Sequence, residues 1–305
     1  MELNFLIDEN YLIYHTLRSM GPDSFSSQKY KKDVVKFQNL AWKISQNSYN
    51  FLIGRITPNQ ISDKNIKKAV SDLPPFLKKL KASSGFKKIL QQTKNYLKLC
   101  QKQWGQNYDK TSKYIRETTG LELERKFTIY ITHPSLKNGN YIGDNQIAWG
   151  HSEEWPNYIT VYLWHEVLHS YFSYSDIDHA VIELIADEEL RSILNKEKYP
   201  PYVGHSHLEK IKKKILPKWK EYLNSSHKDI KKFTKKLSSL KYVLFLKNSL
   251  TSFGLIYFSN SNTLKFPFGI IALKIRSVLR SDETFRIFTA IIYLLWSASA
   301  NAWRE

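Results

Sequence analysis

Apolar residues repeat with a helical period through most of residues 1–120. The clearest example is the segment from residue 86 to residue 104, where lysine and glutamine occupy the face opposite the apolar side chains. This spacing predicts an amphipathic helix that packs one face against a core. The apolar stripe consists of Phe86, Ile89, Leu90, Thr93, Tyr96, Leu97, Cys100 and Trp104.

Proline and glycine divide this N-terminal region into predicted elements. Pro74 and Pro75 interrupt the helical pattern, so we expect a short helix before them that Ser62 caps. Gly120 is expected to end another helix, which begins near Asp109. The region is therefore predicted to be mostly helical.

The hydrophobic period changes to two beyond Gly120. Phe127, Ile129 and Ile131 alternate with other residues, which predicts a strand with one buried face. Asn138-Gly139 predicts a turn. Residues 145–150, with the sequence NQIAWG, predict a second short strand.

Helical patterns return after the second strand. Residues 159–172 (ITVYLWHEVLHSYF) are mostly apolar, and a short polar link separates them from a second helix near residues 179–194. Residues 206–238 predict one or two basic helices. Together these patterns predict an α+β fold that is mostly α. We expect a helical region at 1–120, a core at 121–205 and a basic helical region at 206–305.

Basic side chains outnumber acidic ones, but the two kinds are unevenly distributed. The formal net charge is +18, whereas residues 151–200 carry ten acidic and three basic side chains, a local charge of −7. Such a basic excess is typical of proteins that bind nucleic acid or anionic membranes. The lysines are scattered and no nucleic-acid-binding signature accompanies them. We therefore interpret them as solvated faces and do not expect a nucleic-acid partner.

The cysteine content and the sequences of the N- and C-terminal segments indicate the cellular location of the protein. Cys100 is the single cysteine, so no intramolecular disulfide forms, which fits a reducing compartment. The first residues have no features of a signal peptide, and a cytoplasmic location is expected. Residues 287–303 are uncharged but only just long enough for a membrane span. A buried C-terminal helix is favoured there, with membrane association through this tail as the alternative.

The most specific chemical pattern is HEVLH at residues 165–169. His165 and His169 are four residues apart, so on a helix both imidazoles lie on one face and can bind one metal ion. Zinc prefers such nitrogen ligands. Glu166 lies about 100° around the helix, where it flanks the metal and can take a proton from a zinc-bound water. The pattern predicts a catalytic zinc site.

A third ligand is expected from the following helix. If the two helices form an antiparallel hairpin about residue 176, Glu183 faces His169 and Asp187 faces His165. Glu183 is then placed to bind the metal, and Asp187 is placed to accept the outer N–H of His165. His179, near the start of the second helix, is the alternative third ligand.

HEVLH followed by ELIAD resembles the gluzincin group of zinc metallopeptidases, over about residues 125–195. The resemblance implies a zincin-like core with a small antiparallel sheet before the active-site helix, and one Zn²⁺ per chain. His165, His169 and Glu183 match the ligands of the group, Glu166 its general base and Asp187 its outer acid. An edge strand of the group binds extended substrate, and the strand similar to it in position contains Gln146, Ile147, Ala148 and Trp149.

Two features depart from the gluzincin pattern. The gap between His169 and Glu183 is short, which implies a compact hairpin. The transition-state donor of the group, a tyrosine or histidine beyond the third ligand, has no clear match, and the candidates are Tyr199, Tyr202, His205 and His207.

Other zinc classes fit the sequence less well. Metzincins need a histidine six residues beyond the second ligand, where this chain has Ser175, and a later methionine, whereas none follows Met20. Deformylases need a cysteine ligand, but Cys100 lies on an apolar helical stripe. A DNA-associated protease with three histidine ligands would use His179 in place of Glu183.

The sequence thus predicts a zinc-dependent metallopeptidase that hydrolyses a peptide or protein substrate. Two alternatives belong to other classes. One is a non-catalytic protein with a zinc site, against which Glu166 argues, since a structural site needs no base. The other is a basic protein that binds nucleic acid or a membrane surface, whose binding would weaken steeply with salt.

Overall fold

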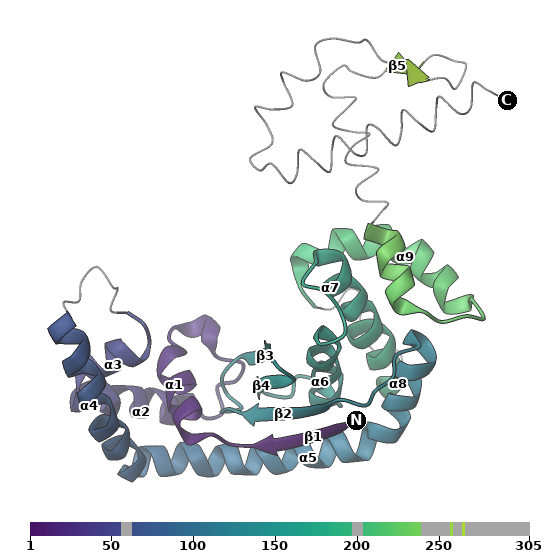
Figure 1. Cartoon of the computed structure of the whole chain (residues 1–305). Helices are drawn as coiled ribbons and strands as arrows, with labels where there is room; N and C mark the ends of the chain where they lie inside the picture. The colour runs from purple at the N-terminus through teal and green to yellow at the C-terminus, as the bar shows by residue number, and fades with distance from the viewer. Residues whose placement is uncertain (56–62, 197–203, 239–256, 259–263, 266–305) are drawn as a thin grey trace. The chain divides into compact units, whose positions relative to one another are not determined.

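A four-stranded mixed sheet lies against the longest of the described helices in the computed structural model (Figure 1). The structure describes residues 1–55, 63–196 and 204–238 and the short strand pair β5 (Tyr257–Phe258) and β6 (Leu264–Lys265). By their contacts, residues 1–238 form one compact unit, and residues 239–305 are assigned to a second. Within the second unit, β5 and β6 pair in antiparallel fashion.

The sheet has the strand order β1-β2-β4-β3. Its strands are β1 (Glu2–Leu6), β2 (Lys126–Ile131), β3 (Asn138–Gly143) and β4 (Gln146–Gly150). β1 and β4 both pair with β2 in parallel, and β3 pairs with β4 in antiparallel fashion. The predicted strands at 127–131 and 145–150 are confirmed. The expected antiparallel sheet is corrected to a mixed one, and β1 adds a strand to a region expected to be mostly helical.

The turn of the β3–β4 hairpin is not where the sequence predicted it. Asn138 and Gly139 begin β3, and the chain turns instead at Asp144 and Asn145. Both turn residues have positive φ angles, 47° and 56°. Asp and Asn tolerate this left-handed backbone, which matches the twist of a tight hairpin.

The N-terminal helices pack around an apolar core of their own. They are α1 (Glu9–Arg18), η1 (Pro22–Ser24), α2 (Lys31–Ile44), α3 (Gln46–Leu52) and α4 (Asp63–Ala82). The core includes Leu17, Phe37, Leu80 and Phe86, all of them buried. The predicted break at Pro74 and Pro75 is wrong, because α4 continues through both. Burial of Phe76 and Leu80 beyond the prolines stabilises the helix there.

Helix α5 (Ser84–Thr119) contains the predicted segment 86–104 and continues without a break to Gly120. The expected start of a new helix near Asp109 is therefore wrong. Gly120 ends the helix as predicted, with a left-handed φ of 68°, and the Ser83 hydroxyl caps its first turn. With 36 residues, α5 is about 54 Å long and contacts both the N-terminal helices and the sheet. Cys100 is buried on its core face, as predicted.

The helices after the sheet form a second group that packs on α5 and on the sheet. They are α6 (Tyr158–His169), α7 (Asp176–Glu183), the π-helical η3 (Leu184–Leu190), α8 (Arg191–Asn195), η4 (Ser206–Leu208) and α9 (Glu209–Asn224). A further helical segment covers residues 230–238, so the prediction of one or two basic helices at 206–238 is confirmed. The observed fold agrees with the predicted α+β class that is mostly α.

Candidate metal centre

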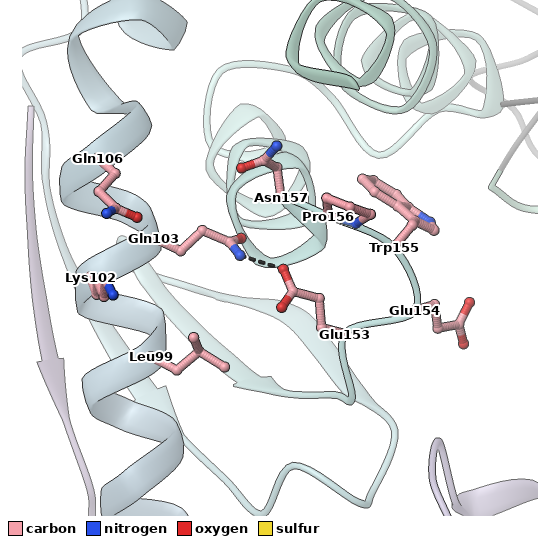
Figure 2. A pocket seen from close by; sticks show the side chains of 9 residues that line it. All are labelled: Leu99, Lys102, Gln103, Gln106, Glu153, Glu154, Trp155, Pro156 and Asn157. Carbon is pink, nitrogen blue, oxygen red and sulfur yellow. Dashed lines mark hydrogen bonds between the residues drawn. The ribbon is translucent and has the colours of Figure 1, made fainter. Parts of the chain in front are cut away.

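A pocket of about 520 Å³ lies between α5 and the loop that leads into α6 (Figure 2). Its lining includes Gln103 of α5 and Glu153 of the loop, and the Gln103 amide donates a hydrogen bond to the Glu153 carboxylate. None of the histidines of HEVLH lines this pocket. The candidate centre is therefore identified by its converging side chains and not by a hollow in the surface.

Helix α6 buries both the first histidine and the glutamate of HEVLH. It begins after Asn157, whose left-handed backbone (φ 66°) is held by side-chain hydrogen bonds. The Asn157 amide accepts from Asn107 of α5 at 2.9 Å and donates to Asn195 of α8 at 3.1 Å. His165 and Glu166 are buried, whereas His169, at the end of the helix, is partly exposed. The apolar sequence around the motif thus forms a core helix with a polar end.

Asp187 contacts His165 as the sequence predicted. The distance between His165 Nδ1 and Asp187 Oδ1 is 3.1 Å, and both side chains are buried. Burial alone would lower the pKa of His165, but the adjacent carboxylate outweighs it and raises that pKa to about 9. This contact turns the Nε2 atom of His165 away from Asp187 and toward His179.

Three imidazoles converge at the ends of α6 and α7. The ligand nitrogens of His165, His169 and His179 all lie within 4.8 Å of one another. His165 Nε2 and His179 Nε2 are 3.2 Å apart. Ligands about 2.0–2.1 Å from a tetrahedral zinc ion are separated by roughly this distance. The structure therefore brings His179, the alternative third ligand, into the group that holds both histidines of HEVLH.

Glu183 belongs to a second, overlapping group with His179 and His205. Its Oε1 atom accepts hydrogen bonds from the backbone N–H and from Nδ1 of His205, both at 2.7 Å, and lies 4.0 Å from His179 Nε2. Burial raises the pKa of Glu183, but the hydrogen bonds from His205 and Lys212 outweigh burial and lower it to about 2. Glu183 is thus an ionised, buried carboxylate beside the three imidazoles.

Gly204 allows the loop before η4 to approach Glu183. A Cβ atom at this position would lie 2.5 Å from the Glu183 Cδ atom, and the backbone has a φ of 110° that other residues rarely adopt. The next residue, His205, can therefore place both its N–H and its ring on the carboxylate.

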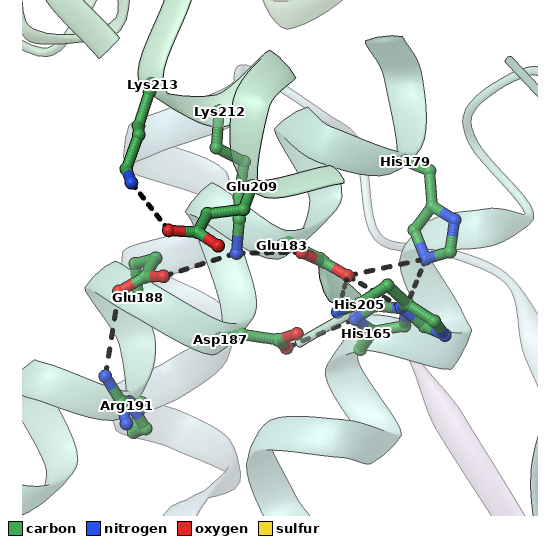
Figure 3. Close-up of polar contacts among 10 residues, drawn as sticks. All are labelled: His165, His179, Glu183, Asp187, Glu188, Arg191, His205, Glu209, Lys212 and Lys213. Carbon is green, nitrogen blue, oxygen red and sulfur yellow. Dashed lines mark hydrogen bonds and ion pairs between the residues drawn. The ribbon is translucent and has the colours of Figure 1, made fainter. Parts of the chain in front are cut away.

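Lys212 and Arg191 supply positive charge on the other side of the carboxylates (Figure 3). Lys212 Nζ lies 2.9 Å from Glu183 Oε2 and 3.4 Å from Glu188 Oε1. Arg191 lies 3.6 Å from the second oxygen of Glu188. Counting Glu166 and Asp187 as well, four carboxylates face Lys212, Arg191 and the protonated ring of His165, which leaves a formal charge of −1. A cation at the imidazoles would offset this charge.

Glu166 points toward strand β3. Its Oε2 atom accepts a hydrogen bond from the backbone N–H of Tyr141 at 2.7 Å. A Cβ atom on Gly139 would lie 3.0 Å from the Trp149 ring and 3.3 Å from Oε1, so the glycine lets β3 pack closely on both side chains. Burial raises the pKa of Glu166, whereas the charge of His165 and the Tyr141 hydrogen bond act against this rise. A raised pKa suits a group that must accept a proton near neutral pH.

The strand that was expected to bind substrate, β4, is not an edge strand of the sheet. β4 lies between β2 and β3, and Ile147, Ala148 and Trp149 are buried in the sheet. Its backbone groups are paired on both sides, so β4, which begins at Gln146, has no free edge. The edge strand beside Glu166 is β3.

The predicted transition-state donors have different positions. Tyr199 and Tyr202 lie outside the described residues, as do residues 287–303 of the apolar tail. His205 contacts Glu183, and His207 is exposed, with its ring 5.6 Å from the ring of His205.

The sequence analysis did not identify Lys212 as part of the centre. It lies in the run KIKKK, where five neighbouring residues include four lysines and composition does not distinguish one from another. Its spacing of three and seven residues from the buried Ile215 and Trp219 is the one signal that places it on the core face of α9.

Comparisons of the chain with protein-family models, with curated proteins and with solved structures found no match. The resemblance to gluzincins therefore depends on the residues of the two motifs. In the described part of the chain, no helix combines the length and the apolar character that crossing a membrane requires.

Proposed function

We propose that this protein is a zinc-dependent metallopeptidase with a zincin-like core. The observation that carries the proposal is the convergence of His165, His169 and His179 within 4.8 Å, next to the buried carboxylate of Glu183. The donor set consists of imidazole nitrogens and a carboxylate oxygen, which are the ligands that zinc accepts. The carboxylates outnumber the positively charged side chains of the centre, which favours a bound cation.

His165 and His169 are the two ligands common to every arrangement that we consider. Glu183 is the proposed third ligand through Oε1, because Asp187, four residues later, contacts His165 as in the gluzincin pattern. His179 is the competing third ligand, and its distance of 3.2 Å from His165 Nε2 favours it. If Glu183 binds the metal, His179 and His205 are available to donate a hydrogen bond to the developing oxyanion.

Zinc, when bound, polarises the scissile carbonyl and makes a water more acidic. Glu166 then accepts the proton of the attacking water and delivers it to the leaving amine. The Tyr141 N–H holds the Glu166 carboxylate in one orientation. Burial of Glu166 keeps bulk water away from the proton that it carries.

The substrate is proposed to pair with β3 in an extended form, in place of β4. β3 is the edge strand next to Glu166, and edge strands offer unpaired backbone groups to an extended peptide. The Tyr141 N–H of this strand contacts Glu166 directly, so a peptide paired with β3 would lie beside the carboxylate. The proposed substrate class is therefore an unfolded segment of a peptide or protein.

The first test is the metal content per chain of protein purified without a metal-affinity tag. The expected result is about one zinc in the wild type and much less in His165→Ala. Glu183→Gln and His179→Asn then identify the third ligand, since the true ligand variant loses zinc. Cleavage of a peptide library by the zinc-loaded wild type, with Glu166→Gln as control, tests the activity. A folded wild type that takes up no zinc would overturn the proposal.

A non-catalytic zinc site is the second candidate, and one observation favours it. His205 and His179 add ligands to those of the HEVLH motif, and a site with four protein ligands is closed to substrate. Visible spectra of the cobalt-substituted protein distinguish a catalytic site with an open metal position from a closed, non-catalytic site. A spectrum that changes on adding a hydroxamate, a zinc-binding inhibitor group, indicates an open position, and an unchanged spectrum indicates a closed site.

A further inference from the structure

Lys212 is a fully buried lysine with acidic side chains on both sides of its ammonium group. Its side chain has 0% exposure, and its Nζ atom lies 2.9 Å from Glu183 Oε2 and 3.4 Å from Glu188 Oε1. A buried ammonium ion is costly unless opposite charges and hydrogen bonds surround it. Lys212 is therefore held at this position by the two carboxylates.

Helix α9 presents two neighbouring lysines to different environments (Figure 3). Lys212 shares the buried face of the helix with Ile215 and Trp219. Lys213, the next residue, is 55% exposed and pairs with Glu209 at 2.6 Å within the same helix. An exposed pair of this kind contributes little to stability. The two lysines thus form a matched pair for experiment, one inside the centre and one outside it.

The two oxygens of Glu183 have different neighbours. Oε2 faces Lys212, whereas Oε1 faces His205 and lies 4.0 Å from His179 Nε2. An ion at the imidazoles would therefore meet Oε1, because Lys212 already holds the other oxygen. Rotation of the carboxylate would break its contact with Lys212 in the protein interior.

We propose that Lys212 is the counter-ion of the buried Glu183 carboxylate when no metal is bound, and that it competes with the metal ion for this carboxylate. This inference rests on the proposed function, since it assumes that Glu183 is a metal ligand. With a divalent ion bound, Glu183 bridges two cations, and Lys212 repels the ion. Lys212 therefore stabilises the metal-free centre more than the metal-loaded one.

The test is thermal unfolding of Lys212→Met with and without Zn²⁺. Methionine keeps the apolar stem and removes the charge, which leaves Glu183 buried without its counter-ion. We expect the midpoint of the metal-free variant to fall on the order of 10 °C below that of the wild type. Zinc then takes over as the cation beside Glu183, so the zinc-loaded variant should fall by clearly less. The zinc-induced rise in the midpoint is expected to be larger in Lys212→Met than in the wild type.

Two further variants separate charge from packing. Lys213→Met is the matched control and should leave both midpoints and the zinc-induced rise unchanged. The double variant Glu183→Gln/Lys212→Met removes both charges, and its metal-free form should be more stable than metal-free Lys212→Met. If Lys212→Met alone does not fold, the double variant still tests the pairing: its metal-free midpoint should then exceed that of Glu183→Gln.

Each outcome is decisive. Equal loss in the metal-free and zinc-loaded forms of Lys212→Met, with the wild-type zinc-induced rise, would mean that Lys212 only packs and would overturn the inference. A double variant no more stable than the single variants would also overturn it. If zinc raises the wild-type midpoint but Glu183→Gln binds zinc as tightly, the inference fails while the metal site stands. A wild type that does not respond to zinc overturns the proposed function, and the inference with it.

Discussion

The core of the N-terminal helices and the core around α6, α7 and α9 are built from different side chains. The first consists of aliphatic and aromatic residues such as Leu17, Phe37 and Phe86. The second is also apolar over most of its volume, but it additionally encloses Glu183, Asp187 and Lys212. Among the described residues, the first core adds hydrogen-bonded polar side chains such as Gln38 but no buried charge. The second contains charges whose cost must be offset by partners, and a site that binds a cation can be one of them.

Buried histidines make the contrast sharper. His133, at the end of β2, accepts a hydrogen bond on Nδ1 from the Ser135 N–H, and its Nε2 lies 2.9 Å from Gln92 Oε1. Because Nδ1 accepts the hydrogen bond from Ser135, the proton of the ring is on Nε2, which donates to Gln92 Oε1. Both ring nitrogens therefore have hydrogen-bond partners. By contrast, His165 and His179 turn nitrogens toward each other at 3.2 Å. The second arrangement belongs to a group of side chains that could hold a metal ion, whereas both nitrogens of His133 already have partners.

The largest expected effect is on catalysis. Glu166→Gln should reduce peptidase activity on the order of 10²–10⁴-fold, because the amide cannot accept the proton of the attacking water. Glutamine can still accept the Tyr141 hydrogen bond, so zinc content and the unfolding midpoint should stay near the wild-type values. Glu154→Gln, an exposed carboxylate nearby, is the control and should retain full activity. Activity of Glu166→Gln near the wild-type level would rule out its role as the base.

A substitution in the N-terminal core is expected to lower the free energy of unfolding strongly without changing the zinc content. Phe86→Ala removes a buried ring that lies 5.9 Å from the ring of Phe37 and should cost about 3–5 kcal/mol. Urea unfolding measures the loss, and elemental analysis should find the zinc content unchanged. Leu99→Ala, at an exposed position of the same helix, should cost less than about 1 kcal/mol. Loss of zinc from folded Phe86→Ala would show that the two cores are coupled.

The pH dependence should carry a contribution from His133. Burial lowers the pKa of His133 to about 4, against about 6.5 in the unfolded chain. The unfolded state therefore binds the proton first as pH falls. The contribution is complete above pH 6.5 and is lost between about pH 6.5 and 4, up to about 3 kcal/mol.

His133→Gln tests this contribution in protein kept free of metal by a chelator. Glutamine does not titrate, so the variant should lose less stability than the wild type between pH 7 and pH 5. Urea unfolding at these two pH values measures the difference. Equal slopes would show that His133 does not carry the effect.

The smallest expected effect is on metal affinity. Asp187→Asn weakens the contact that orients His165, and such changes reduce zinc affinity about 10–100-fold. Competition with a chromophoric chelator measures the change. Asp176→Asn, at an exposed position in the first turn of α7, should bind zinc as the wild type does. Unchanged affinity in Asp187→Asn would mean that the carboxylate does not support the metal site.

Local patterns in the sequence predicted the elements around the centre and one of its key contacts. The i, i+4 spacing of His165 and His169 and the hairpin register predicted the contact between Asp187 and His165, which the structure confirms. Both depend on residues close together in the chain, where helix geometry limits the possible positions. The register also placed Glu183 beside His169, whereas the structure groups His179 with the two HEVLH histidines.

Contacts between distant parts of the chain could not be predicted in this way. β1 pairs with β2 across about 120 residues. Leu3 and Phe5 do alternate with polar residues, but a pattern of five residues is too short to identify a strand or its partner. The same limit applies to Lys212, which reaches Glu183 from a helix 29 positions later. The continuation of α4 through Pro74 and Pro75 is a further case, because burial of Phe76 and Leu80 outweighs the local preference.

The π-helical turn of η3 contains one residue more than an ordinary α-helix would need between Glu183 and α8. It occupies Leu184–Leu190, between Glu183 and α8, and includes Asp187. A π-turn accommodates one residue more than an α-turn, so a chain shorter by one residue here could close an ordinary helix. Asp187 would keep nearly the same face relative to Glu183, because three α-helical steps rotate by about 300° and four π-helical steps by about 330°. Deletion of one residue among Leu184, Ile185 and Ala186 should therefore remove the π-turn and leave Asp187 close to His165.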